Sequence, residues 1–135
     1  MSRVEVAWRL KAIRGATTVP ENSVDAMRDA VVELLDALDA NNSFNPADLV
    51  SVTFSVTRDL TALFPAAIAR RRSGWDSVPL IDVQHMHVEG DLERCIRFLI
   101  HVYMPSDRPA NHIYLRHARE LRPDLPALSA AHHPS

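Results

Sequence analysis

Apolar and polar residues alternate over the first stretch of the chain, which is the pattern of a β-strand with one buried face. The stretch covers residues 4–14, and the side chains on one of its faces are Val4, Val6, Trp8, Leu10, Ala12 and Arg14. We expect this face to contact the core. A buried guanidinium is costly without an anionic partner. Arg14 is therefore predicted either to form an internal ion pair or to bind an anion at the end of the strand.

A helical period replaces the alternation after Pro20. Either Asn22 or Ser23 can cap the helix. Apolar residues then recur at steps of three and four, at Met27, Ala30, Val31, Leu34, Leu35 and Leu38. This spacing predicts an amphipathic helix that ends at Asn41-Asn42.

Four more strands and one short helix are expected further along the chain. The strands are predicted at residues 49–56, 78–88, 95–104 and 112–115, and the helix at residues 65–72, where Pro65 fits a first helical turn. The order β-α-β-α-β-β-β describes an α/β domain of the α+β-like kind, with a single mixed sheet and about two main helices. Two helices cannot cover both faces and both edges of such a sheet, so we expect the chain to self-associate.

Length and composition suit one domain. Of the 135 residues, we expect residues 1–125 to form the domain and the Ala-, Pro- and His-rich residues 126–135 to form a mobile tail. The net charge of −2 argues against a nucleic-acid binder driven by bulk charge. No apolar run could span a membrane, no signal peptide is expected, and the single cysteine, Cys95, excludes an internal disulfide framework. We therefore expect a cytoplasmic protein.

The residue pattern offers little support for nucleophilic, metal or nucleotide chemistry. None of the three glycines forms a phosphate-binding loop, and Cys95 has no obvious base beside it. The His85-Met86-His87 pair, with His101 or Asp82, is a weak metal signal because cysteines and a second ligand pair are missing. We expect ordinary histidines and no metal or cofactor.

Arginines are the unusual feature of the predicted strands. Arg97 shares a strand face with Cys95, Leu99, His101 and Tyr103. A solvated patch at a helix C-terminus accounts for Arg70, Arg71 and Arg72. Two guanidiniums on strands, Arg14 and Arg97, predict a small polyanionic ligand bound by paired hydrogen bonds.

Five groups of short motifs follow one another along the chain. They are Arg14-Gly15-Ala16-Thr17-Thr18; Phe64-Pro65-Ala66 with Arg70 and Ser73-Gly74-Trp75; Val78-Pro79-Leu80 with Gly90, Leu92 and Cys95-Ile96-Arg97; Tyr114-Leu115; and Leu121-Arg122-Pro123-Asp124-Leu125. In this order and spacing, over roughly residues 10–125, the chain resembles the monofunctional bacterial chorismate mutases of the trimeric α/β-barrel class. The motifs are individually short but specific when they occur together.

This resemblance implies an isomerase that converts chorismate to prephenate, on the way to phenylalanine and tyrosine. The reaction is an intramolecular Claisen-type rearrangement that needs no proton transfer, covalent intermediate or cofactor. The resemblance also implies a pseudo-α/β-barrel homotrimer with its active sites at the subunit interfaces, and no membrane or nucleic-acid partner.

The family's pattern also implies roles for particular residues. Arg97 would donate to the ether oxygen and to a carboxylate, and Arg14 would bind the side-chain carboxylate with help from the Tyr114 hydroxyl. Arg70 would come from the neighbouring subunit. The other residues implied to line the pocket are Phe64, Ala66, Leu80, Ile81, Asp82 and His85, with Leu121 and Arg122 closing its mouth.

Two positions depart from the family's pattern. The family usually has a glutamate at the position of His85, where it accepts a hydrogen bond from the ring hydroxyl, and often a cysteine at the position of Asp82. A neutral imidazole can also accept a hydrogen bond but carries no negative charge. Asp82 and His85 have opposite strand parity, so neither can replace the other within one subunit. We expect activity to persist because Arg14 and Arg97 are present.

Two other functions are weighed against this one. A trimeric enamine/imine deaminase-like enzyme would also use an interface arginine to bind a carboxylate, but the spacing of Cys95-Ile96-Arg97 and Phe64-Pro65-Ala66 disfavours it. The second is a non-catalytic binder of an aromatic-pathway dicarboxylate, in which His85 would mark lost activity.

Overall fold

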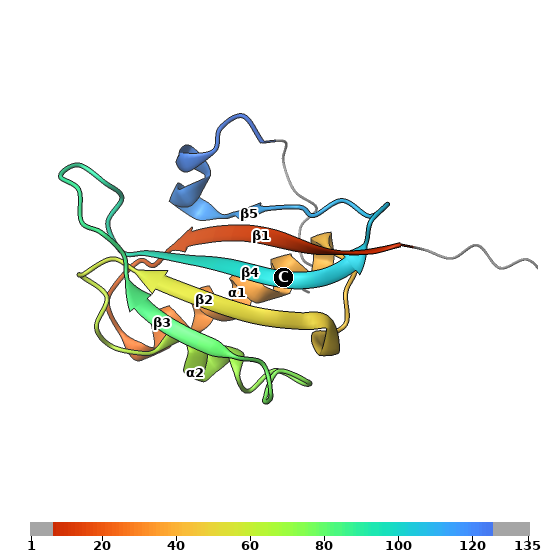
Figure 1. The fold of residues 1–135 in the computed structure, drawn as a ribbon. Coiled ribbons are helices and arrows are strands. Elements are labelled where there is room, and N and C mark those ends of the chain that lie inside the picture. The colour runs from red at the N-terminus through yellow and green to blue at the C-terminus, as the bar shows by residue number, and fades with distance from the viewer. Residues whose placement is uncertain (1–6, 126–135) are drawn as a thin grey trace, which may run out of the picture.

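One five-stranded sheet organises residues 7–125, which are the residues that the computed structural model describes (Figure 1). Its strands are β1 (Trp8–Thr18), β2 (Leu49–Val56), β3 (Leu80–Gln84), β4 (Cys95–Pro105) and β5 (Ile113–Tyr114). The spatial order is β3-β2-β4-β1-β5. β4 is antiparallel to β1 and β2, whereas β5 is parallel to β1 and β3 is parallel to β2. The prediction of a single mixed sheet is confirmed.

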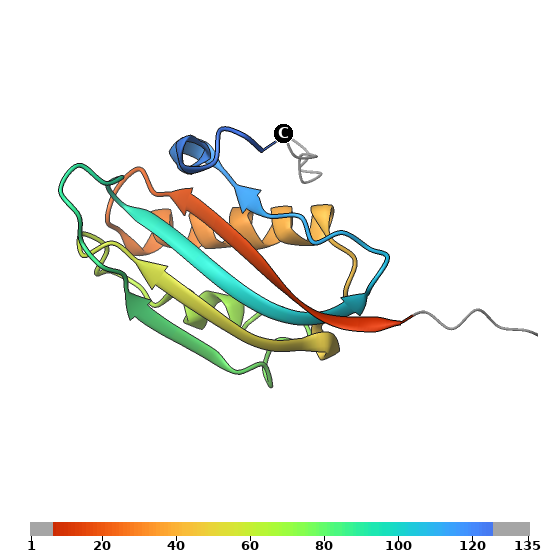
Figure 2. The same cartoon turned by 45° about the horizontal axis from the view of Figure 1, so that its top comes forward.

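The α-helices cover only one face of this sheet (Figure 2). The helical segments are α1 (Val24–Asn41), α2 (Pro65–Ala69) and the 3₁₀ helices η1 (Pro46–Asp48) and η2 (Arg116–Leu121). α1 and α2 lie behind the sheet in Figure 1, and η2 lies beside β5 and the end of β1. Ser23, rather than Asn22, caps α1, because its hydroxyl accepts the Ala26 N–H at 3.2 Å. No helix in this part of the chain is long and apolar enough to cross a membrane.

The core fills the space between α1, α2 and the covered face of the sheet. α1 buries the apolar stripe that its spacing predicts, at Met27, Ala30, Val31, Leu34, Leu35 and Leu38. From the sheet, Ile13, Phe54, Phe98 and Ile100 meet this stripe. Phe54 and Phe98 contact each other edge to face, with ring centroids 6.4 Å apart.

The predicted ends of three elements are wrong. β1 continues to Thr18, because every residue up to that point pairs with β4; the predicted residues 4–6 lie outside the described part. β3 ends at Gln84 instead of residue 88, because β2, its neighbour in the described sheet, ends at Val56. The helix predicted at residues 65–72 ends as α2 at Ala69.

The predicted orientation of β1 is also wrong. Ile13 is fully buried against the helices, whereas Trp8 and Leu10 are 58% and 46% exposed. The row that includes Ala12 and Arg14 therefore lies on the face of the sheet that the helices leave open. Alternation divides a strand into two faces, but it does not determine which face meets the helices.

The open face of the sheet is apolar over much of its area. Its exposed apolar side chains are Trp8 and Leu10 from β1, Ile81 and Val83 from β3, and Leu99 and Tyr103 from β4. Register places Thr53 of β2 between Ile81 and Leu99, so these side chains form one continuous surface across the strands. Contiguous exposed apolar surface of this kind is typical of a contact with another protein chain.

Candidate active site

Five of the predicted site residues line one hollow of about 510 Å³ on the open face of the sheet. They are Arg14, Arg97, Tyr114, Leu121 and Arg122. They come from β1, β4, β5 and the segment around the end of η2. Segments that are far apart in the sequence therefore supply three guanidiniums and a phenol to one place.

Strand register sets the positions of these side chains. Arg97 stands opposite Ala16 of β1 on one side and Ser55 of β2 on the other. Tyr114 stands opposite Ala16 on the far side of β1. The small side chain of Ala16 thus leaves room between Arg97 and Tyr114, and it packs with Tyr114 and Leu121 in a small second cluster.

Gly15 is required by the packing on the opposite face of β1. A Cβ atom built at this position would lie 2.3 Å from Cζ of Phe98, which is the cross-strand partner of Gly15. The Phe98 ring therefore occupies the space that a side chain would take. This close approach holds the backbone between Arg14 and Ala16 against β4.

The guanidiniums differ in their partners. Within residues 7–125, the structure gives Arg14 no ion pair, whereas Arg97 Nη2 lies 3.4 Å from Asp91 Oδ2. Arg122 makes a two-point contact with Asp124, at 3.1 and 3.0 Å. Of the three guanidiniums in the hollow, Arg14 is thus the one that has no carboxylate partner among the described residues.

His85 lies next to Arg97 on the same side of the sheet. Its Nδ1 is 3.0 Å from Ser55 Oγ, and Ser55 is the cross-strand neighbour of Arg97. Burial, and then the positive charge of Arg97, lower the pKa of His85 below its usual value. The imidazole is therefore neutral at neutral pH. His85 Nε2 is buried and has no hydrogen-bond partner in the described residues.

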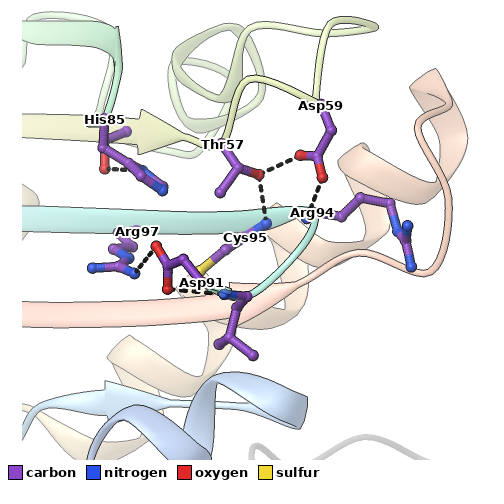
Figure 3. A network of polar contacts seen from close by, with 9 residues as sticks. Thr57, Asp59, His85, Asp91, Arg94, Cys95 and Arg97 are labelled. Atoms are coloured by element: carbon purple, nitrogen blue, oxygen red, sulfur yellow. Dashed lines mark hydrogen bonds and ion pairs between the residues drawn. The ribbon is translucent and has the colours of Figure 1, made fainter. Parts of the chain in front are cut away.

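A polar network fixes the start of β4, just before Arg97 (Figure 3). The Thr57 hydroxyl accepts the Cys95 N–H at 2.9 Å and itself donates to Asp59. Asp59 also accepts the backbone N–H of Arg94, whose φ of 46° lies in the left-handed region. Burial raises the pKa of the Cys95 thiol, so this cysteine stays protonated and is a poor nucleophile.

The remaining predicted site residues lie towards the β3 side of the molecule. Phe64 is 71% exposed and lines a separate cavity of about 250 Å³ together with Asp82. Asp82 Oδ1 accepts the Ala66 N–H at 3.0 Å, so this carboxylate holds the start of α2. Burial raises the pKa of Asp82, although that hydrogen bond opposes the shift.

The same region contains the last predicted site residues. Ala66 is buried in the core and Ile81 is exposed on the open face, while Leu80 packs against the core from β3. Arg70 is exposed just after α2. By contrast, Arg72 is held by ion pairs to Asp36 and Asp39 of α1. A single chain does not bring this group into the hollow that contains Arg14 and Arg97.

Two residues of the site were not predicted from the sequence. Asp91 has no role in the sequence-based predictions, and its contact with Arg97 depends on the path of the β3–β4 loop (residues 85–94). Ser55 stands on the polar side of β2, and pairing β2 with β4 would have revealed it as a neighbour of Arg97. Within residues 7–125, no three His, Cys, Asp or Glu side chains are grouped as a metal site requires.

This geometry suits the binding of a small compound with two anionic groups. Two separated guanidiniums and a phenol can donate hydrogen bonds to carboxylates. A family model described as chorismate mutase type I matches residues 10–125.

The chain belongs to the chorismate mutase type I family.

Individual relatives agree with this family over most of their length. Chorismate mutase AroH of Bacillus subtilis (strain 168) is 39% identical over 118 residues, which cover 86% of this chain and 92% of the relative. Chorismate mutase AroH of Thermus thermophilus is 44% identical over 119 residues, which cover 86% of this chain and 96% of the relative. A solved chorismate mutase from Clostridium thermocellum superposes with a TM-score of 0.74 at 39% identity, covering 82% of this chain and 98% of that one. The fold expected of this family is therefore confirmed.

Proposed function

We propose that this chain catalyses the rearrangement of chorismate to prephenate and is thus an isomerase of phenylalanine and tyrosine biosynthesis. The observation that carries the proposal is the meeting of Arg14, Arg97 and Tyr114 in one hollow of a chain from this family. The relatives reported above bear the name of the same activity. A deaminase-like enzyme and a non-catalytic binder are not favoured by these matches.

The reaction asks for positioning and fixed charge rather than for acid–base groups. An ether C–O bond breaks while a C–C bond forms within one molecule. The pocket holds the flexible enolpyruvyl arm over the ring, and cationic donors stabilise negative charge that develops on the ether oxygen. A rate gain of ~10⁶ corresponds to ~8 kcal/mol. The protonated Cys95 and the neutral His85 fit a site of this kind.

Arg97 and Arg14 have different roles in this proposal. Arg97 is partly buried in the middle of the sheet and donates to the ether oxygen, where a fixed charge acts most strongly. Arg14 lies on β1 without an anionic partner in the described residues and binds the substrate's side-chain carboxylate. The Tyr114 hydroxyl assists at this carboxylate.

His85 takes the place of the family's usual glutamate. Its imidazole is neutral, and its Nε2 is buried without a partner in the described residues. We assign it the role of accepting a hydrogen bond from the ring hydroxyl of chorismate. The tautomer that leaves Nε2 free to accept carries its proton on Nδ1, facing the Ser55 hydroxyl.

The other half of the pocket comes from a neighbouring subunit in this proposal. Phe64 and Arg70 are exposed on one chain and lie away from its own Arg14 and Arg97. Leu80, Ile81, Asp82 and Ala66 belong to the same side of the molecule. The exposed apolar face of the sheet supports association through that face, and we propose a homotrimer with three shared pockets.

The segment after η2 closes the mouth of the pocket in this proposal. Leu121 and Arg122 line the hollow, and Leu121 packs with Tyr114. Arg122 is already paired with Asp124 two residues away. A substrate carboxylate would compete with Asp124 for this guanidinium. We further propose that residues 1–125 act as one domain in the cytoplasm; the tail expected at residues 126–135 lies outside the described residues.

The test is the loss of chorismate absorbance with purified protein and no added cofactor. We expect consumption ~10⁶-fold faster than the uncatalysed reaction, at the lower end of the usual range for enzymes. A rate equal to the uncatalysed one, with the protein folded, would refute the proposed function. If chorismate binds tightly but is not consumed, the non-catalytic alternative takes its place.

A further inference from the structure

Arg97 has a carboxylate partner close to it in sequence. Asp91 Oδ2 lies 3.4 Å from Arg97 Nη2, and the two side chains are only 26% and 30% exposed. Figure 3 shows the Asp91 side chain turned towards the guanidinium. The contact uses one of the three guanidinium nitrogens, and Arg97 Nε is buried without a partner in the described residues. Asp91 can therefore hold Arg97 without occupying its whole hydrogen-bonding edge.

The backbone of the β3–β4 loop fixes the Asp91 carboxylate independently of Arg97. Asp91 Oδ1 accepts the Leu92 N–H at 2.8 Å, and the Asp91 N–H donates to Val88 O at 3.1 Å. Gly90 precedes Asp91 with a φ of +82°, the left-handed conformation that the third position of a type II turn requires. The turn thus presents a carboxylate whose direction is set before any ligand binds.

His85 cannot supply a negative charge to Arg97. Its pKa is lowered by burial and by Arg97 itself, so the imidazole is neutral at neutral pH. Asp91 and His85 line the same cavity of about 230 Å³. Three carboxylates of the described residues line this cavity, those of Asp59, Asp91 and Glu93, and Asp91 is the one that forms an ion pair with Arg97.

We propose that Asp91 is a positioning residue for Arg97, and that it supplies from the β3–β4 loop the negative charge that the neutral His85 cannot provide. The inference rests on the proposed mutase function. Asp91 holds the Arg97 guanidinium in the orientation that meets the ether oxygen, while His85 keeps only the role of a neutral acceptor. Misplacing a catalytic group by about 1 Å can cost ~100-fold in rate.

A double-mutant cycle on the full chain tests this exchange of charge. The variants are Asp91→Asn, His85→Glu and the two combined, with Glu89→Gln as a control that removes an exposed carboxylate from the same loop. Asn at position 91 keeps an oxygen for the Leu92 N–H, so the turn is retained. Each variant is assayed for kcat and KM with chorismate, and its melting temperature reports whether it is folded.

We expect Asp91→Asn to lower kcat by at least ~10-fold with a melting temperature close to that of the wild type, and Glu89→Gln to behave like the wild type. His85→Glu should raise kcat in the Asp91→Asn background, because it restores one carboxylate beside Arg97. In the wild-type background it should lower kcat, because two carboxylates then compete for one guanidinium and repel the anionic substrate. A structural role alone would not produce this reversal.

The outcomes separate this inference from the proposed function. Equal effects of His85→Glu in both backgrounds, or a kcat/KM of Asp91→Asn equal to or above the wild-type value, would overturn the role of Asp91 while leaving the mutase activity intact. An inactive wild-type protein would instead refute the mutase function itself.

Discussion

The two arginines that the strands contribute to the site differ in whether a carboxylate of the chain already pairs with them. Arg97 has Asp91 at 3.4 Å, whereas Arg14 has no ion pair in the part of the chain that the structure describes. An unpaired guanidinium gains most from a ligand carboxylate in the ground state, so it contributes mainly to binding. A guanidinium that is held in place beforehand is better suited to charge that appears only in the transition state.

Replacing Arg14 should therefore affect binding more than chemistry. In Arg14→Ala, the loss of a charge-assisted hydrogen bond of ~1.5–3 kcal/mol should raise the KM for chorismate ~10- to 100-fold, with a smaller change in kcat. Arg9→Ala is the matched control, since Arg9 is exposed on the same strand and outside the hollow. Steady-state kinetics give both constants. A normal KM with a collapsed kcat would reverse the roles assigned to the two arginines.

Protonation of His85 should make kcat/KM fall in acidic solution. The pKa of His85 lies below the usual histidine value of about 6.5, so the imidazole is mostly neutral at pH 6.5 and above. Below that lowered pKa the ring gains a proton, cannot accept the ring hydroxyl and stands as a second cation beside Arg97. We expect kcat/KM to be level from pH 8 down to pH 6.5 and to fall by up to ~10-fold per pH unit once the pH drops below the lowered pKa of His85.

The control for this prediction is His85→Gln, which can accept a hydrogen bond but does not titrate. Its kcat/KM should not show this fall in acidic solution. An identical fall of kcat/KM in acid for both proteins would remove His85 from the mechanism.

At the scale of single elements, β1 packs tightly against the core on one face and carries residues of the site on the other. Its Gly15 lies against the Phe98 ring on the helix-covered face, while Arg14 and Ala16 face the hollow. Packing in the core and geometry in the site are therefore coupled through one backbone segment.

Gly15→Ala should disturb both faces of this strand. The new methyl would overlap the end of the Phe98 ring, and overpacking of this kind costs ~1–3 kcal/mol. Urea unfolding should show this loss, accompanied by reduced kcat/KM. Phe98→Leu removes the ring atoms nearest to the methyl, so the double variant should lose less stability than the two single losses added together. Strictly additive losses would contradict the proposed overlap.

Much of each element could be predicted from the sequence, but its limits and orientation could not. The period of α1 was sufficient because one side of a helix must be apolar to meet the core. β1 was assigned the wrong buried face, since Trp8 and Leu10 are apolar on a face that the helices leave exposed. β3 was predicted too long, because its end is set by the length of its partner β2.

The site, too, could be predicted from the sequence only in part. Arg14 and Arg97 were singled out from the strand pattern and Tyr114 through the motifs, and the structure brings all three into one hollow. Asp91 was missed because its contact with Arg97 depends on the left-handed turn at Gly90. Contacts that arise from loop geometry leave little trace in residue periodicity.

At the scale of the whole molecule, the sheet has helices on one face and exposed apolar side chains on the other. Trp8, Leu10, Leu99 and Tyr103 form adjoining parts of that surface on β1 and β4. The site residues on β3 and α2 lie away from the hollow of the same chain. Association through the open face would cover the apolar surface and could also complete the pocket.

Leu10→Glu tests this assembly. Light scattering coupled to gel filtration should give the wild type a mass of three times the 15.1 kDa chain. A charge on the apolar face should shift Leu10→Glu to monomers and lower its activity at least ~10-fold, because the shared pockets are lost. Val32→Glu, on the exposed side of α1, should remain trimeric. A monomeric and active wild type would contradict the shared pocket.

The most direct test of catalysis by fixed charge is the kcat for chorismate of the wild type beside Arg97→Ala, with no cofactor added. Removing one preorganised donor to a developing anion typically costs ~10²- to 10³-fold in kcat. We therefore predict a wild-type rate far above the uncatalysed one and an Arg97→Ala value at least ~100-fold lower, with the exposed Arg119→Ala unchanged. Equal kcat values for the wild type and Arg97→Ala would contradict the account.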